Sequence, residues 1–415
     1  MRHVPVLRHR DFRLLFAGQA VSIIGDSLFP IALAFAVLDD LGGSAGELGL
    51  VLAAQVVPMT FLVLVAGVWA DRMSRRALML FSDLGRAAVQ VVAAVLLLAG
   101  TAELWHLIVL SVAYGALEAF FRPAQGGLTP SLVPADELQQ ANSLVGLAYN
   151  VGHVVGPAAA GLLVVLLSPG AAVAIDAATF VVSAAFLVFM REPRRERRPD
   201  APAPHFWAEL KGGIAEVRAR RWMLAFIPPF SAYHFIALPC VLALGAVLAD
   251  RELGGAGAWA ITVSCFGVGT IAGSIVGLRW KPSRPMLVAT LAFVGASCQP
   301  AIIALAGSTA AIAAFQAVAG VAVSIGFTQW ETTLGRLIPG AALSRVTSLD
   351  WFTTVGIMPL GYALAGPLAD EFGLHETMVG ATVVTVAMFL AALAVREVRT
   401  LPQEAPRAAQ ESIAS

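Results

Sequence analysis

Charged residues and cysteines are scarce in this sequence. Only 13% of its 415 residues are charged, against about 25% in ordinary soluble domains. So little polar surface cannot cover the core of a soluble chain of this size, which excludes a water-soluble enzyme and a disordered protein. Cys240, Cys265 and Cys298 all lie in apolar runs without metal-ligand spacing. This excludes a disulfide scaffold, and we expect no metal site.

The chain also lacks an excess of either charge. Lys+Arg and Asp+Glu each number 27, so the net charge is zero, whereas nucleic-acid binders normally show a basic excess. No Gly-x-x-x-x-Gly-Lys phosphate loop is present, which argues against an ATP-driven pump. We therefore expect neither a nucleic-acid partner nor a cofactor.

Apolar residues are abundant, at 58% of the chain with a mean hydropathy of +0.79. Backbone groups in lipid must be paired internally, so runs of roughly 20 apolar residues predict membrane-spanning helices. The first run follows N-terminal arginines and is too long for a signal peptide. The sequence predicts an all-α membrane protein with twelve spans, at 14–38, 46–70, 77–99, 104–128, 141–166, 170–190, 222–248, 256–278, 285–306, 310–333, 347–368 and 374–395.

Basic residues alternate with acidic ones along the predicted loops. Arginines occupy the N-terminus, the loop after the second span and the middle loop, whereas the loops on the other side carry acids and a single arginine, Arg251. The positive-inside rule then places both termini in the cytoplasm. We expect a multi-pass protein of the cell (inner or plasma) membrane.

The longest polar stretch divides the predicted spans into six and six. Residues 1–190 form the predicted N-terminal bundle, 191–221 a cytoplasmic linker, 222–396 the C-terminal bundle and 397–415 a cytoplasmic tail. The halves share a repeat at an offset of 205, for example Gly156 with Gly361 and Gly161 with Gly366. Related six-span halves are an architecture of transporters that expose a site alternately to each side.

The loop after the second span reads GVWADRMSRRALML. Its spacing, residue types and position resemble motif A of the major facilitator superfamily. The resemblance implies two pseudo-symmetric six-helix bundles, and it implies that this loop acts as a conformational latch on the inner side. The alternative is that the arginines of the loop only reflect the positive-inside rule. The latch residues are Gly67, Asp71, Arg72, Arg75 and Arg76.

The fifth span carries a glycine motif that resembles motif C of the superfamily's antiporters. Its members are Gly152, Gly156, Pro157 and Gly161. Ordinary close helix packing is an equal alternative to an antiport role, because small residues let helices approach and proline bends them. Other stretches, SIIGDSLFPIALAF and FFRPAQGGLTPSLVP among them, resemble the efflux branch that includes macrolide and enterobactin exporters.

Ionisable residues at membrane depth are candidates for coupling transport to protons. Asp26 lies near mid-span, four residues before Pro30, which leaves the carbonyl of residue 26 without its helical partner. A structural hydrogen bond is the alternative role. Glu118 and Arg122 are one turn apart and are expected to pair, either for coupling or as a structural pair. His153 and His234 are further candidates, or simply hydrogen-bonded histidines.

Other polar and aromatic residues have structural interpretations beside functional ones. Inner-side ion pairs are expected between Asp83 and Arg86 and between Glu331 and Arg336, and Asp176 is expected near the outer end of its span, in contact with water. Aromatic residues on the helices that the resemblance assigns to the central cavity could form a pocket for amphipathic ligands, or merely pack. They are Phe29, Tyr114, Phe121, Tyr233, Phe235 and Trp330.

Together these features predict a secondary transporter and not an enzyme. The expected activity is proton-coupled efflux of an amphipathic small molecule such as a drug, antibiotic or siderophore-like metabolite, by a monomer in the lipid bilayer. A lipid or lysolipid translocase of the same fold is the alternative. A membrane-embedded enzyme acting on lipid-linked substrates would need clustered acids, and Asp39–Asp40 is an isolated pair.

Overall fold

The computed structural model describes residues 5–134, 137–192, 214–338 and 340–402, except for some side chains at 64–72, 278, 340–345 and 348. Its regular structure in these ranges is helical, and twelve helical segments are long and apolar enough to cross a membrane. The predicted fold class is confirmed.

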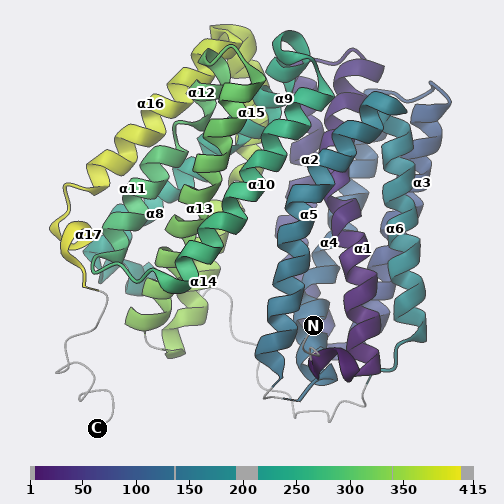
Figure 1. The fold of residues 1–415 in the computed structure, drawn as a ribbon, viewed down its shortest axis with the longest axis horizontal. Coiled ribbons are helices and arrows are strands. Elements are labelled where there is room, and N and C mark those ends of the chain that lie inside the picture. Colours follow the sequence, from purple (N-terminus) through teal and green to yellow (C-terminus); the bar gives the residue numbers. More distant parts are fainter. Residues whose placement is uncertain (1–4, 135–136, 193–213, 339, 403–415) are drawn as a thin grey trace. The chain divides into compact units, whose positions relative to one another are not determined.

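The first six spans use one main helix each (Figure 1). A short helix η1 (Pro5–Arg8) precedes them, and a π-helical turn η2 (Ala36–Asp40) extends the first. The six are α1 (Arg10–Phe35), α2 (Ala45–Arg72), α3 (Arg75–Leu98), α4 (Leu104–Leu132), α5 (Leu138–Leu166) and α6 (Pro169–Phe189).

The later spans are more broken. The seventh consists of five short pieces, and three prolines within it, Pro228, Pro229 and Pro239, each lack the N–H that a regular helix would use. In order the helices are α8 (Arg221–Ala232), η3 (Tyr233–Ala237), η4 (Cys240–Leu244), α9 (Gly245–Leu248), η5 (Ala249–Leu253), α10 (Ala256–Arg279), α11 (Pro285–Ala296), α12 (Gln299–Leu305), α13 (Thr309–Leu337), α14 (Gly340–Thr354), α15 (Met358–Phe372), α16 (Leu374–Ala392) and α17 (Arg396–Thr400).

Serine caps define where several helices begin. The hydroxyl oxygens of Ser44, Ser74, Ser168 and Ser308 each accept a hydrogen bond from the backbone N–H three residues later, at the starts of α2, α3, α6 and α13. Each cap satisfies one of the N–H groups that a helix leaves free at its first turn. At α2 the cap is a full capping box with Glu47.

Contacts divide the chain into two compact units. The first consists of Met1–Arg197, Ala243–Ser264 and Tyr362–Glu371, and the second of Arg198–Leu242, Cys265–Gly361 and Phe372–Ser415. The first unit thus holds all of α1 to α6, and the second holds α8, α11 to α14 and α16. Most of the predicted linker 191–221 falls within 193–213, outside the described residues, and the predicted domain boundaries stay a prediction.

The two units bury different kinds of side chain. In the first, a core around Phe12, Leu78, Met79 and Leu128 packs near the start of α1, and charged groups are buried farther along α3. In the second, the core is aromatic, and Trp330 stacks on Phe226 with ring centroids 4.7 Å apart.

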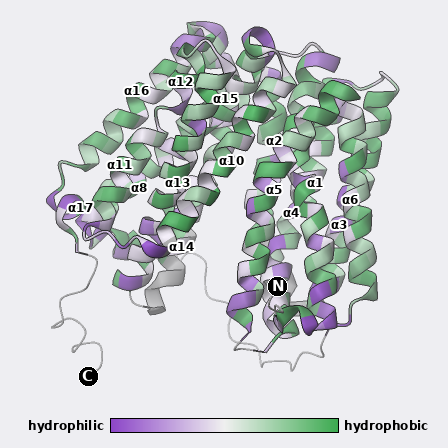
Figure 2. Ribbon diagram, in the orientation of Figure 1, coloured by the Kyte–Doolittle hydropathy of each residue, from purple (hydrophilic) through white to green (hydrophobic). Residues whose placement is uncertain are grey.

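Hydrophobic residues make up most of the length of the helices (Figure 2), and many of their side chains are exposed. Val95, Leu98, Leu167 and Phe189 are each at least 59% exposed. Exposing such side chains to water costs free energy, whereas contact with lipid does not. The exposed apolar surface therefore fits twelve spans that cross a membrane.

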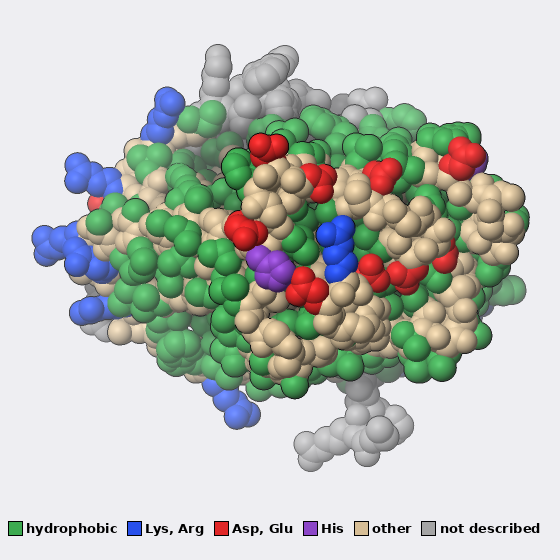
Figure 3. Space-filling view, turned by 90° about the horizontal axis from the view of Figure 1, so that it is seen from above, with side chains coloured by type: hydrophobic (Ala, Val, Ile, Leu, Met, Phe, Trp, Pro, Cys, Tyr) green, Lys and Arg blue, Asp and Glu red, His purple; other side chains and the backbone are tan. Residues whose placement is uncertain are grey.

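Charged side chains sort to the ends of the first unit. Arg8, Arg10 and Arg13 lie at the end where α1 begins, and acids lie at the end where α1 gives way to η2. Figure 3 looks down on this second end, where acidic side chains gather. The acids in the turns and helix starts that follow α1 and the seventh span include Asp39, Asp40, Glu47 and Asp250.

Candidate functional site

The carboxylate of Asp26 lies inside the first unit, on α1. Its Oδ1 accepts hydrogen bonds from Arg86 Nη1 on α3 at 3.1 Å and from the Tyr114 hydroxyl on α4 at 2.8 Å. The side chain of Asp26 keeps 34% of its surface exposed, whereas that of Arg86 keeps 1%. Asp26 is therefore the accessible end of a charge pair whose other member is buried.

Arg86 joins Asp26 to a second carboxylate. Its Nη2 donates to Asp83 Oδ1 at 2.8 Å, and Ser183 Oγ of α6 donates to Asp83 Oδ2 at 2.7 Å. The guanidinium carbon also lies 4.2 Å from the centroid of the Phe180 ring, a cation–π contact that compensates part of the lost hydration. The predicted Asp83–Arg86 contact is present, but it is fully buried and also bound to Asp26.

These residues belong to a polar ladder between α3 and α6. On α3, Asp83, Arg86 and Gln90 are spaced by three and four residues, so they lie on one face. Facing them in antiparallel order on α6 are Ser183, Phe180 and Asp176, and all six residues are at most 1% exposed. We call these six residues the α3–α6 ladder. The i, i+3, i+7 spacing of Asp83, Arg86 and Gln90 could have revealed it from sequence.

The last rung joins Asp176 to Gln90. Gln90 Nε2 donates to Asp176 Oδ2 at 2.7 Å, and Asp176 is 0% exposed. The expectation that Asp176 contacts water is wrong. It failed because helix α1 covers the carboxyl group at Gly25, whose missing side chain permits the contact.

Glu118 and Arg122 do not form the expected ion pair among the described contacts. Glu118 Oε2 instead accepts a 3.5 Å hydrogen bond from Gln55 Nε2 on α2. The exposed Arg122 lies over the ring of Tyr149 on α5, with 5.6 Å between the guanidinium carbon and the ring centroid. Although a spacing of four residues permits a pair, partners on neighbouring helices compete for both side chains.

The two candidate histidines differ in setting. His153 is exposed on α5. His234 is partly buried in η3, where its Nδ1 is 2.9 Å from the carbonyl oxygen of Phe230. As the carbonyl can only accept, Nδ1 carries the proton and Nε2 is left as an acceptor in the neutral ring.

The loop between α2 and α3 is fastened to the end of α6. Glu192 accepts hydrogen bonds from the hydroxyl of Ser74 and from the backbone N–H of Arg75 at 3.0 Å. Arg76 donates to the carbonyls of Leu187 and Val188 at 2.6 Å each, where a positive charge suits a helix C-terminus. Arg75 also donates to the Gly127 carbonyl on α4. Gly67 lies in α2, and the side chains of Asp71 and Arg72 lie outside the described part.

The glycine motif of α5 lies where other helices come close. A Cβ on Gly152 would lie 2.5 Å from Ile23, one on Gly156 2.2 Å from Ser27, and one on Gly161 2.2 Å from Ala260. Pro157 is buried beside them. These contacts account for the glycines as packing residues, and an antiport role stays a proposal.

Most of the candidate cavity aromatics are packed into cores. Phe29 and Tyr114 contact each other with ring centroids 4.7 Å apart, and Phe121 lies against Arg86. Trp330 is 0% and Tyr233 3% exposed, and only Phe235 is less completely buried. In this state they support the fold more than they line an open pocket.

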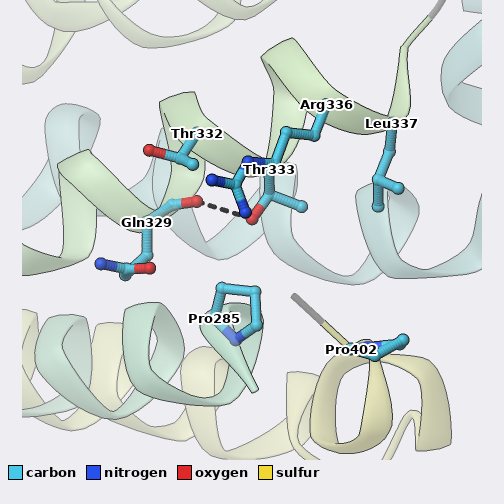
Figure 4. Close-up of a pocket in the computed structure, with 7 residues that line it drawn as sticks. All are labelled: Pro285, Gln329, Thr332, Thr333, Arg336, Leu337 and Pro402. Atoms are coloured by element: carbon cyan, nitrogen blue, oxygen red, sulfur yellow. Dashed lines mark hydrogen bonds between the residues drawn. The ribbon is translucent and has the colours of Figure 1, made fainter. Parts of the chain in front are cut away.

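Two predicted partners lie near the end of α13. Glu331 is exposed there, and its expected ion pair with Arg336 stays a prediction. Arg336 lines a small recess with room for about one water molecule (Figure 4). Nearby, Trp330 Nε1 donates to Asp350 at 3.1 Å. Asp350 is a buried acid that the sequence analysis missed because it lies near the predicted start of a span.

Comparisons with known proteins agree with this architecture. A family model described as transmembrane secretion effector, of the major facilitator superfamily (MFS), matches residues 3–413. The chain belongs to this family. It is a multi-pass transporter with twelve spans and not an enzyme, and its substrate is a small molecule.

Two named relatives cover nearly the whole MFS chain. Macrolide efflux protein A of Streptococcus pyogenes is 24% identical over 393 residues, which cover 94% of this chain and 97% of the relative. The multidrug efflux pump Tap of Mycobacterium tuberculosis is 27% identical over 422 residues, which cover 94% of this chain and 95% of the relative.

Solved structures share the fold. A variant of the nucleoside transporter NupG has a TM-score of 0.76 at 13% identity, covering 92% of this chain and 99% of that one. An inward-facing bacterial homologue of the human lysosomal transporter Spinster has a TM-score of 0.66 at 15% identity, covering 94% and 98%.

Proposed function

We propose that this MFS transporter is a proton-coupled exporter of an amphipathic small molecule that works by alternating access. The observation that carries the proposal is the Asp26–Arg86 pair, in which a partly exposed carboxylate is bound to a fully buried cation. The relatives named for macrolide and multidrug efflux support the outward direction. The charge sorting in the first unit supports cytoplasmic termini in a plasma membrane.

Protonation of Asp26 changes the balance at Arg86. When Asp26 is ionised, Arg86 holds α1 and α3 together through Asp26 and Asp83. A proton on Asp26 removes one of the two negative charges, so Arg86 is held by Asp83 alone and the attraction of α1 to α3 weakens. A change of this kind at a buried ion pair is large enough to bias two conformations of a bundle.

Glu118 extends the acidic surface that a substrate would meet. It lies in α4, one turn beyond Tyr114, and its described hydrogen bond comes from a neutral amide, that of Gln55. Asp26 and Glu118 together give a protonatable surface on two helices. An amphipathic substrate that competes with protons for this surface would be exchanged against them.

The test is gradient-driven transport by Asp26→Asn, which keeps the size of the side chain and removes its charge. Wild-type protein in inside-out membrane vesicles should accumulate a radiolabelled macrolide or another member of an amphipathic panel when the vesicle lumen is acid. Accumulation in vesicles with Asp26→Asn should fall to the level of vesicles without transporter. Asp40→Asn, an exposed acid of the same span, should transport like wild type.

Folding is checked by size-exclusion chromatography in detergent. A folded Asp26→Asn that transports as well as wild type under the same gradient would contradict the role of Asp26. Wild-type transport that is insensitive to an uncoupler would contradict proton coupling altogether.

A further inference from the structure

Among the described contacts, the carboxyl group of Asp176 meets only neutral polar groups. Gln90 Nε2 donates to Oδ2 at 2.7 Å, and the Thr179 hydroxyl oxygen lies 3.3 Å from Oδ1. The residue is 0% exposed. The one buried cation in the described part of the chain is Arg86, and it is bound to Asp26 and Asp83. An ionised carboxylate in this position would lack a counter-ion of its own.

Helix α1 covers the carboxyl group of Asp176 on the side of Gly25. A Cβ added to Gly25 would lie 2.4 Å from Asp176 Oδ1 and 2.1 Å from Thr179 Oγ1. The backbone of α1 therefore rests directly on the carboxyl group, one residue before Asp26. Asp176 is shielded from water only as long as α1 keeps this position.

A proton on this carboxyl group has an acceptor beside it. The single hydrogen of the Thr179 hydroxyl bonds to the backbone carbonyl oxygen of Asp176 at 2.8 Å, so Thr179 Oγ1 can accept a hydrogen bond from a protonated Oδ1, 3.3 Å away. Gln90 Nε2 continues to donate to Oδ2. The protonated form of Asp176 therefore has a hydrogen-bond partner for each oxygen without a counter-ion.

We propose that Asp176 is a second proton-binding residue of the transporter, which holds a proton in this state and releases it when Asp26 takes one up. The inference rests on the proposed proton coupling and extends it from α1 to the α3–α6 ladder. Asp176 lies two helical turns along α6 from Ser183, at the far end of the ladder from the arginine-rich loop.

Neighbouring charges couple the two acids. Asp26 on α1 acts on Asp176 as a like charge and Arg86 on α3 as an opposite charge, and Asp176 in turn acts on Tyr114 of α4. The other elements that contact α6 are α5, with Tyr149 and His153, and η2, with Asp39 and Asp40. No hydrogen bond or ion pair to Asp176 from these four is found among the described contacts.

The exchange balances without any other reactant. While Asp26 is ionised, its negative charge opposes ionisation of Asp176, which keeps its proton. When Asp26 binds a proton, that opposition ends, and Arg86 has one negative partner fewer. Movement of α1 away at Gly25 then lets Asp176 release its proton to water, so one proton is bound and one released.

The decisive variant is Asp176→Asn in the full-length protein reconstituted in liposomes. Asparagine can still bond to Gln90 and Thr179, so we expect the fold and the exchange of a labelled macrolide at equal pH to be kept. Accumulation driven by a pH gradient should be lost. Glu371→Gln, an exposed acid, should leave both measurements unchanged.

Two further measurements separate proton binding from a structural hydrogen bond. Infrared spectra of wild-type protein at neutral pH should show a protonated carboxyl C=O band that Asp176→Asn removes and Gln90→Leu shifts. Adding Gln90→Glu to Asp176→Asn returns a carboxyl group to the same rung and should restore part of the gradient response.

The outcomes decide between the two proposals. Normal gradient-driven accumulation by a folded Asp176→Asn, or the absence of a protonated carboxyl band that responds to Gln90→Leu, would overturn the role of Asp176. If Asp176→Asn does not fold, the wild-type band and its shift in Gln90→Leu still decide. A wild-type protein without any gradient response, but with this band, would overturn the proposed function and leave Asp176 protonated.

Discussion

At the residue scale, Arg86 determines how the first unit can tolerate its buried acids. It contacts two carboxylates and three aromatic rings, those of Tyr114, Phe121 and Phe180. Asp83 and Arg86 could be recognised as a pair from their spacing in the sequence. That Asp26 is the third member could not, because sixty residues separate it from Arg86 and only the packing of α1 against α3 and α6 brings them together.

Replacing Arg86 by methionine should destabilise the protein strongly. Arg86→Met keeps an unbranched side chain but leaves Asp26 and Asp83 without their cation, a loss that typically costs about 3–5 kcal/mol. The thermal unfolding midpoint in detergent should fall markedly. Arg13→Gln, at an exposed position, should change stability by less than about 0.5 kcal/mol. Equal midpoints for the two variants would show that Arg86 does not hold the site together.

At the element scale, equivalent glycines position equivalent helices in the two halves. At the offset of 205 found in the sequence, Gly115 corresponds to Gly320. A Cβ on Gly115 of α4 would lie 1.9 Å from the Gln55 carbonyl oxygen on α2, and one on Gly320 of α13 would lie 2.2 Å from the Phe266 carbonyl oxygen on α10. The repeat was visible in sequence, but which glycines lie at a helix crossing depends on the direction each one faces.

Two glycines of the same helix should therefore respond oppositely to alanine. Gly115→Ala forces α2 and α4 apart and should lower the unfolding midpoint and the yield of folded protein. Gly126 has nothing within 4 Å of an added Cβ. The higher helix propensity of alanine should therefore raise the free energy of unfolding of Gly126→Ala by up to about 1 kcal/mol. Unfolding in detergent measures both, and a Gly115→Ala protein as stable as Gly126→Ala would contradict the close crossing.

At the scale of the whole molecule, the alternation of basic and acidic loops predicts the topology. After Cys240, Cys265 and Cys298 are replaced by alanine, Glu103→Cys should react with a membrane-impermeant maleimide in intact cells. Arg191→Cys should react only after the membrane is permeabilised. The reverse labelling pattern would contradict cytoplasmic termini, and with them the direction proposed for export.

The sequence alone determined that the chain spans a membrane twelve times, and it indicated the superfamily and the repeat. It could do so because hydropathy, loop charge and motif spacing are local properties, and lipid imposes one solution on the backbone. Only the tertiary structure decided which partner each buried acid has: Asp26 has Arg86, Glu118 has Gln55, and Asp176 has Gln90. The physical reason is that a charge buried in a bundle binds whichever partner its neighbouring helices bring within reach, and helix packing, not distance along the chain, sets that choice.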